Sequence, residues 1–97
     1  MEQKRFEVIF SSSAQKDIES LEVDKALQLT MGIKTYLETS PFPIGKTRIK
    51  RLTNFDPPLY RLRSGDFRVY YRINPPKAVI LAIMHKKDSE KFLKKFK

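Results

Sequence analysis

The segment LYRLRSGDFRVYYRI, residues 59–73, constrains the fold more than any other part of this chain. Large apolar or aromatic residues alternate with arginines on both sides of the short sequence SGDF. Alternation with period 2 predicts β-strands, and glycine supplies the positive φ that a tight hairpin turn needs. We therefore predict a hairpin with Gly65 and Asp66 at its tip, in which Arg63 faces Arg68.

Strand geometry divides this hairpin into two chemically different faces, because successive side chains point to opposite sides. The first face is apolar and is predicted to be core; it carries Tyr60, Leu62, Phe67, Val69, Tyr71 and Ile73. The second face carries Arg61, Arg63, Arg68, Tyr70 and Arg72. Like charges opposite one another on a sheet cost about 0.2–1 kcal/mol. The arginines either extend into water, with their apolar stems covering apolar surface, or they bind phosphate. Because there are four of them on one face, we favour phosphate binding.

Charge is distributed unevenly along the chain, which has a net charge of +9 over 97 residues. Residues 1–44 hold seven acidic and five basic residues, whereas residues 45–97 hold four acidic and fifteen basic ones. This asymmetry favours a polyanionic partner, either nucleic acid or an acidic protein. A solvated basic face that aids solubility is the alternative.

The remaining patterns predict one α+β domain over residues 1–97. Two amphipathic helices follow a first strand at 5–11, with Ser12 and Asp24 as N-caps, and Pro41 and Pro43 end the second helix. The inner stripe of the second helix is expected to hold Leu27, Thr30, Ile33 and Leu37, broadened by Ala26, Leu29 and Tyr36. An outer strand at 45–52, the hairpin and a buried strand at 78–84 follow. A helix at 88–97 completes the chain, with Asp88 as its N-cap and with Phe92, Leu93 and Phe96 on a small apolar stripe. Three successive strands joined by short turns should form an antiparallel meander against the helical hairpin.

Composition excludes several classes of protein. No apolar stretch approaches the roughly 20 residues of a membrane-spanning helix, and the N-terminus has no signal-peptide pattern, so we expect a cytoplasmic protein without a membrane partner. The absence of cysteine excludes disulfides and thiolate sites. With a single histidine, a dedicated transition-metal site is not expected.

The stretches KRLTNFDPPLYRLRSGDFRVYYRI and VILAIMHKKDSEKF, residues 50–73 and 79–92, resemble the RelE/ParE superfamily. Its members are the toxins of type II toxin–antitoxin modules. The resemblance implies a small twisted, mainly antiparallel sheet with an N-terminal helical hairpin and a short C-terminal helix. RelE-like members are ribosome-dependent endonucleases that cleave mRNA in the ribosomal A site and use no cofactor. ParE-like members inhibit DNA gyrase without being nucleases, and an inactive homologue is a third possibility.

RNA cleavage of this kind proceeds by attack of a 2′-hydroxyl on the adjacent phosphate, which needs charge stabilisation and proton transfer but no metal. Arginine stabilises charge but cannot act as a base. The resemblance places catalytic roles at Arg61, Arg63, Arg68 and Lys86, and a tyrosine role at the position of Phe92, which has no hydroxyl. His85 is the natural substitute as proton carrier. The expected RNA-binding residues are Lys46, Arg48, Lys50, Arg51, Tyr70, Arg72 and Lys87.

Two of these RNA-binding residues have an alternative chemical role. Neighbouring cations favour the neutral amine of Lys50, which makes it another candidate base. Tyr70 could stack on a base or replace the missing hydroxyl of Phe92.

A toxin of this superfamily also implies a cognate acidic antitoxin, similar to RelB, with a partly disordered segment that folds on the basic surface. We expect this segment to cover Arg61, Arg63 and Arg68 and to displace the C-terminal helix. The other partner is mRNA in the ribosomal A site, or DNA gyrase if the chain is ParE-like.

Overall fold

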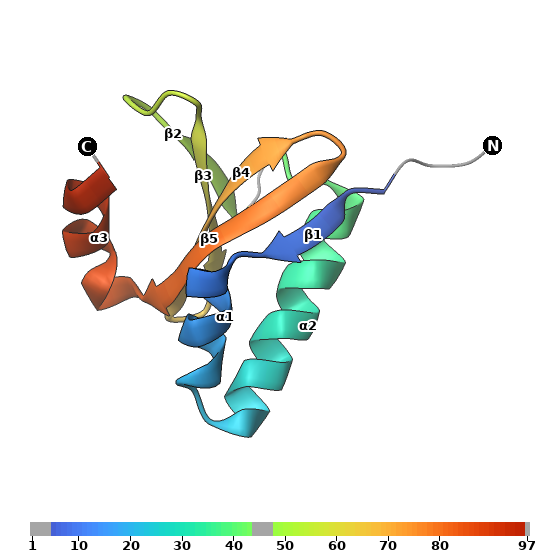
Figure 1. The fold of residues 1–97 in the computed structure, drawn as a ribbon, viewed down its shortest axis with the longest axis vertical. Helices are drawn as coiled ribbons and strands as arrows, with labels where there is room; N and C mark the ends of the chain where they lie inside the picture. The colour runs from blue at the N-terminus through green and yellow to red at the C-terminus, as the bar shows by residue number, and fades with distance from the viewer. Residues whose placement is uncertain (1–4, 44–47, 97) are drawn as a thin grey trace.

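A computed structural model describes residues 5–43 and 48–96 of the chain (Figure 1). The described elements follow the predicted order of strand, two helices, four strands and a final helix, which confirms the α+β class. The strands are β1 (Glu7–Phe10), β2 (Ile49–Leu52), β3 (Leu59–Ser64), β4 (Phe67–Asn74) and β5 (Lys77–His85). The helices are α1 (Ser12–Glu19), α2 (Val23–Thr39) and α3 (Ser89–Phe96), with a 3-10 turn, η1 (Lys86–Asp88), before α3.

The sheet has the strand order β1-β5-β4-β3-β2. The predicted antiparallel meander is present and has four strands, β2 to β5, where three were expected, while β1 lies parallel to β5 at the edge. The hairpin has the predicted register, because Arg63 pairs with Arg68 and Arg61 with Tyr70. Gly65 has a φ of 59° in the turn, a conformation that few other residues adopt without strain.

The helix starts differ from the sequence prediction at both helices. The N-cap of α1 is Ser11 and not Ser12, since the Ser11 hydroxyl accepts a hydrogen bond from the Ala14 amide at 3.1 Å. The second helix begins at Val23, so Asp24 lies inside its first turn and does not cap it. In the first turn, the negative charge of Asp24 still interacts favourably with the positive end of the helix dipole.

The buried face of α2 is also not quite the predicted one. Leu29, Ile33 and Leu37 are buried, four residues apart, whereas Leu27 is 56% exposed. Leu27 precedes Leu29 by two positions, and at about 100° per residue that spacing points it to the opposite side of the helix. The prediction that Leu27 belongs to the inner stripe is therefore wrong.

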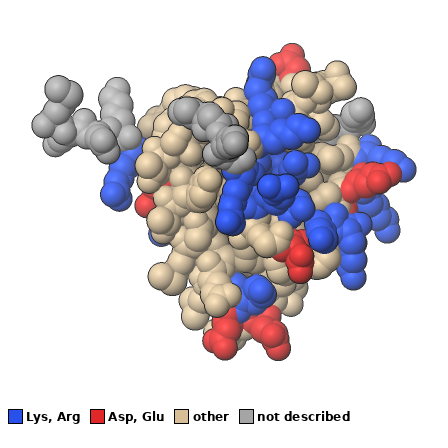
Figure 2. Space-filling model, turned by 180° about the vertical axis from the view of Figure 1, so that it is seen from behind, with Lys and Arg blue, Asp and Glu red and all other residues tan. Residues whose placement is uncertain are grey.

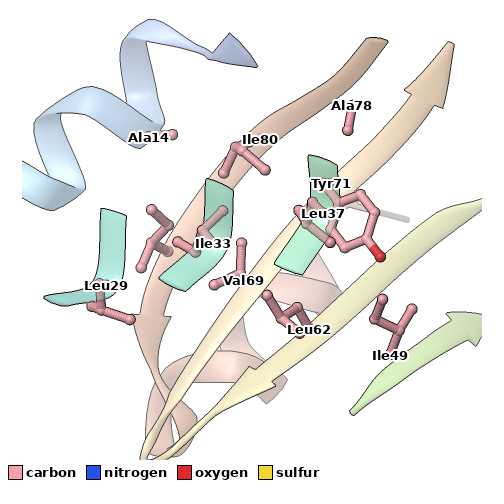
Figure 3. Close-up of a cluster of buried hydrophobic side chains, with 11 residues drawn as sticks. Ala14, Leu29, Ile33, Leu37, Ile49, Leu62, Val69, Tyr71, Ala78 and Ile80 are labelled. Carbon is pink, nitrogen blue, oxygen red and sulfur yellow. The ribbon is translucent and has the colours of Figure 1, made fainter. Parts of the chain in front are cut away.

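The core lies between α1, α2 and the predicted apolar face of the sheet (Figure 3). Leu62, Val69 and Tyr71 are buried there, with Tyr60, Phe67 and Ile73 packed around them. Strand β5 adds Ala78, Ile80 and Ile83. The helices contribute Ala14, Leu29, Ile33 and Leu37, and β2 contributes Ile49.

A β-bulge interrupts the pairing of β4 with β5. Tyr70 pairs with Ala82 and Tyr71 with Ile80, which leaves Leu81 without a partner in β4. The extra residue shifts the alternation of β5, so that side chains after the bulge change faces. Beyond the end of β1, side chains of α1 and of its N-cap pair with backbone groups of β5. The hydroxyl of the N-cap Ser11 donates a hydrogen bond to the Leu81 carbonyl at 3.3 Å, and the Ile83 amide donates to Asp17 Oδ2 at 2.9 Å.

Tyr71 anchors the loop after α2, because its hydroxyl donates to the Pro41 carbonyl at 2.6 Å inside the core. Burial, and secondarily the neighbouring Tyr60 and Tyr36, raises the pKa of this hydroxyl above its usual value of 10.0. The folded state therefore retains a proton that the unfolded chain loses above that pH. The contribution of the protonated Tyr71 to the free energy of unfolding is complete below pH 10 and should fall by about 1.4 kcal/mol per pH unit above it.

We expect Tyr71→Phe to lower the free energy of unfolding at pH 8 by about 1–3 kcal/mol, since a buried carbonyl loses its donor. The deficit should shrink between pH 10 and 11, because the phenylalanine has no proton to lose. Urea unfolding at several pH values measures both effects. Parallel pH profiles for the two proteins would contradict this assignment.

Candidate nucleic-acid interface

The side of the sheet that faces away from α1 and α2 carries the residues that we call the arginine face: Arg61, Arg63, Arg68, Tyr70 and Arg72. The cross-strand pairs Arg61 with Tyr70 and Arg63 with Arg68 place them in two adjacent rows. This is the face that the alternation of the sequence predicted. The other face of the same strands packs on the core, which holds the backbone of the arginine face in a fixed position.

The cations of the arginine face differ in exposure and in bonding. Arg63 is exposed, while Arg61, Arg68 and Arg72 are partly buried. One terminal nitrogen of Arg68 donates hydrogen bonds to the Gly65 carbonyl at 3.0 Å and to the Phe67 carbonyl at 2.9 Å. These bonds stabilise the hairpin turn. The Nε of Arg61 is buried and has no hydrogen-bond partner among the described residues. Of these cations, Arg68 is thus held in place at the turn by its hydrogen bonds.

Strand β2 extends the basic surface beyond the hairpin. Lys50 pairs with Arg61 and so lies on the same side of the sheet as the arginine face. Just before β2, the Arg48 carbonyl accepts a hydrogen bond from the Arg63 amide at 3.0 Å, which places the Arg48 backbone beside Arg63. Arg51 pairs with Tyr60 and lies on the other side of the sheet. Lys46 falls outside the described residues. Figure 2 shows lysine and arginine side chains gathered on one side of the molecule, with few acidic side chains among them.

Lys86 and Lys87 follow β5 at the end of the sheet where the hairpin turns. The Lys86 amide donates to the Asp66 carbonyl at 2.7 Å, and its Nζ lies 3.6 Å from Asp66 Oδ1. Both lysines are exposed. The structure thereby brings Lys86 to the tip of the hairpin, beside the turn that leads into Arg68.

His85 is not brought to the arginine face. It pairs with Phe67, and the two rings make an edge contact at 5.9 Å on the side of the sheet that the helices cover. Its Nδ1 accepts a hydrogen bond from the Lys87 amide at 3.2 Å and so caps η1, which replaces the N-cap predicted at Asp88. The cause is the bulge at Leu81: without it, the alternation from Ile80 would place His85 on the opposite side of the sheet.

Helix α3 lies apart from α1 and α2 and packs on the arginine face instead (Figure 1). The ring of Phe92 contacts the ring of Tyr70 with centroids 4.9 Å apart and planes tilted by 33°. Tyr70 is fully buried as a result, although it is not part of the helix-side core. Sequence reasoning placed Tyr70 on this face and Phe92 on an apolar stripe, but no pattern in either segment indicated that the two would meet.

The arrangement is suited to holding and neutralising an anion. A row of guanidinium and ammonium groups provides fixed positive charge and planar hydrogen-bond donors for phosphate oxygens. Proton transfer has fewer candidates on this face, namely the Lys50 amine and the Tyr70 hydroxyl. No helix among the described residues has both the length and the apolar character to cross a membrane.

The fold is that of RelE toxins from toxin–antitoxin systems whose structures have been solved. The RelBE2 toxin–antitoxin complex of Mycobacterium tuberculosis contains a similar chain, with 23% identity and a TM-score of 0.69 over 87% of this chain and 94% of that one. The archaeal RelE–RelB complex of Pyrococcus horikoshii contains another, with 26% identity and a TM-score of 0.68 over 84% and 96%. A mutant of Escherichia coli RelE in the free state is 18% identical, with a TM-score of 0.61 over 92% of both chains.

The family is shown by a model of the ParE toxin of the type II toxin–antitoxin system, parDE, which matches residues 8–90. This chain therefore belongs to the ParE toxin family, within the RelE/ParE superfamily, and is the toxin of a type II toxin–antitoxin system. No curated protein sequence matches it significantly.

Proposed function

We propose that this toxin acts as a ribosome-dependent endonuclease that cleaves mRNA in the ribosomal A site and so inhibits translation. The observation that carries the proposal is the arginine face, in which Arg61, Arg63 and Arg68 share one side of a hairpin whose other side is core. Like charges in adjacent rows destabilise a sheet unless a polyanion neutralises them. RNA phosphates are the polyanion that this proposal supplies.

In the proposed reaction, the 2′-hydroxyl attacks the adjacent phosphorus while the 5′-oxygen of the next nucleotide leaves. Arg61, Arg63 and Arg68 would stabilise the added negative charge on the phosphoryl oxygens, with Lys86 beside the turn. The proton leaves the 2′-hydroxyl and a proton reaches the 5′-oxygen. Lys50 and Tyr70 are the groups on the arginine face that can exchange protons, whereas His85 would need a route around the end of the sheet.

The proposed antitoxin is an acidic chain that covers the same face. The similar structures of M. tuberculosis and P. horikoshii are complexes of a toxin with its antitoxin, which favours a RelB-like partner here. Carboxylates of a segment that folds on binding would pair with Arg61, Arg63 and Arg68, and the segment would displace α3. Antitoxin and RNA would then compete for one surface.

Inhibition of DNA gyrase is the second candidate function, and the family match to ParE toxins favours it. It requires binding without proton transfer, so the shortage of acid–base groups on the arginine face is no obstacle to it. Under this alternative the basic surface would recognise gyrase or the DNA that gyrase holds.

Induction of the toxin in growing cells distinguishes the two. For the endonuclease we expect rapid arrest of translation and new mRNA 5′ ends within codons, with plasmid supercoiling unchanged. Induction of Arg68→Ala in parallel should abolish the new ends. Intact mRNA together with accumulating gyrase–DNA breaks would reject the endonuclease and establish the alternative.

A further inference from the structure

The hydroxyl of Tyr70 has a feature that neither proposed activity explains. Tyr70 is 0% exposed, and its hydroxyl has no hydrogen-bond partner among the residues that the structure describes. A buried hydroxyl normally finds a partner, because leaving it unpaired sacrifices its hydration without compensation. In this conformation, burial of the unpaired Tyr70 hydroxyl is therefore energetically unfavourable.

Arg61, on the neighbouring strand, also has a buried donor without a partner in the part of the chain that the structure describes. It pairs with Tyr70 across β3 and β4, and this donor is its Nε. Side chains at directly paired positions have Cβ atoms about 4.5–5.5 Å apart, so Arg61 and Tyr70 are neighbours on the arginine face. The phenol O–H and the guanidinium N–H are both donors, and an anion supplies the acceptor oxygens that both lack.

The ring of Phe92 packs on the ring of Tyr70 at this face. It lies 4.9 Å from the Tyr70 ring, centroid to centroid, and contributes no acceptor. Ala82, the partner of Tyr70 in β5, leaves room for the ring because its side chain is a single methyl group. Phe92, Ala82 and Met84 line one hollow, which continues past β5 to Ser11, Ser13 and Asp17 at α1.

We propose that α3 is docked in a closed form of the arginine face, and that a phosphate group of RNA replaces the Phe92 ring and accepts hydrogen bonds from Tyr70 Oη and Arg61 Nε. The choice of RNA as the source of the phosphate rests on the proposed function. A ligand shifts a conformational equilibrium by its difference in affinity for the two states. The open form gains two hydrogen bonds that the closed form lacks, so the phosphate favours opening.

The test measures binding of a short single-stranded RNA, and separately of pyrophosphate, to four proteins: wild type, Phe92→Ala, Tyr70→Phe and the double variant. Phe92→Ala should bind both ligands about threefold to tenfold more tightly, because the closed form no longer competes. Tyr70→Phe in the Phe92→Ala background should remove most of this gain. Met31→Ala, at an exposed apolar position of α2, serves as the control and should bind like the wild type.

Equal affinities of Phe92→Ala and the double variant would overturn the proposal, as would a Phe92→Ala variant that binds no more tightly than wild type. The wild-type chain provides an independent measurement if Phe92→Ala fails to fold. Amide hydrogen exchange over residues 89–96 should become faster when pyrophosphate binds, and unchanged or slower exchange would overturn the proposal. If pyrophosphate shows the expected pattern but RNA does not bind, the closed form stands and the proposed endonuclease function fails.

Discussion

Replacing both Arg61 and Arg63 by alanine should abolish the toxicity of this protein and lower the rate of mRNA cleavage by at least about 100-fold, since each removes a charge-stabilising donor from the proposed site. Binding to single-stranded RNA should also become less salt-dependent, by about 0.7 in the logarithmic slope for each phosphate that the variant no longer neutralises. Fluorescence anisotropy over a range of salt concentrations measures the slope.

The fold should survive this double change. Arg63 faces Arg68, so its removal relieves repulsion between like charges, an effect of about 0.2–1 kcal/mol. Arg5→Ala is the matched control, because Arg5 is 78% exposed and its ion pair with Glu38 is long, at 3.9 Å. Such surface pairs contribute about 0–1 kcal/mol. Undiminished cleavage by the Arg61/Arg63 variant, or an equal loss in Arg5→Ala, would contradict the assignment of the arginine face.

The second large effect concerns stability and compares two leucines of α2. Leu29→Ala should lower the free energy of unfolding by about 2–5 kcal/mol, because Leu29 is 4% exposed and its removal leaves a cavity in the core. Leu27→Ala should change it by less than about 0.5 kcal/mol, since Leu27 is 56% exposed. Both variants delete the same atoms from the same helix.

Denaturant unfolding of the two variants and the wild type measures this difference directly. Alanine also has a slightly higher helix propensity than leucine, so Leu27→Ala is not expected to destabilise α2. Equal losses in the two variants would show that both leucines are core residues, as the sequence had suggested. A loss confined to Leu27→Ala would contradict the packing of α2 on the sheet.

Several features of the fold could be predicted because local physical chemistry decides them. The turn at Gly65, the pairing of Arg63 with Arg68 and the separation of apolar and cationic faces all follow from period-2 alternation around a glycine. Proline at positions 41 and 43 likewise ends α2 near its predicted limit, because proline cannot continue the helical hydrogen bonds. Nearby residues suffice for such predictions.

The prediction was poorer where neighbouring positions looked chemically alike. Leu27 and Leu29 are both leucines on one helix, and only the position of the sheet decides which of them is buried. Ser11 and Ser12 are equally good caps in isolation, and the start of α1 after β1 selects the first.

By itself, the sequence determined that this chain forms an antiparallel hairpin with a core face and an arginine face, since both follow from the order of side chains along two strands. Only the tertiary structure decided which groups surround the arginines. A bulge at Leu81 turns His85 toward the helices, and the packing of α3 brings Phe92 onto Tyr70. The run AVILAIM is apolar on both sides of the bulge, so no change of polarity marks the shift in phase. Contacts between distant segments therefore set the chemistry of the site, whereas alternation along the strands set its charge.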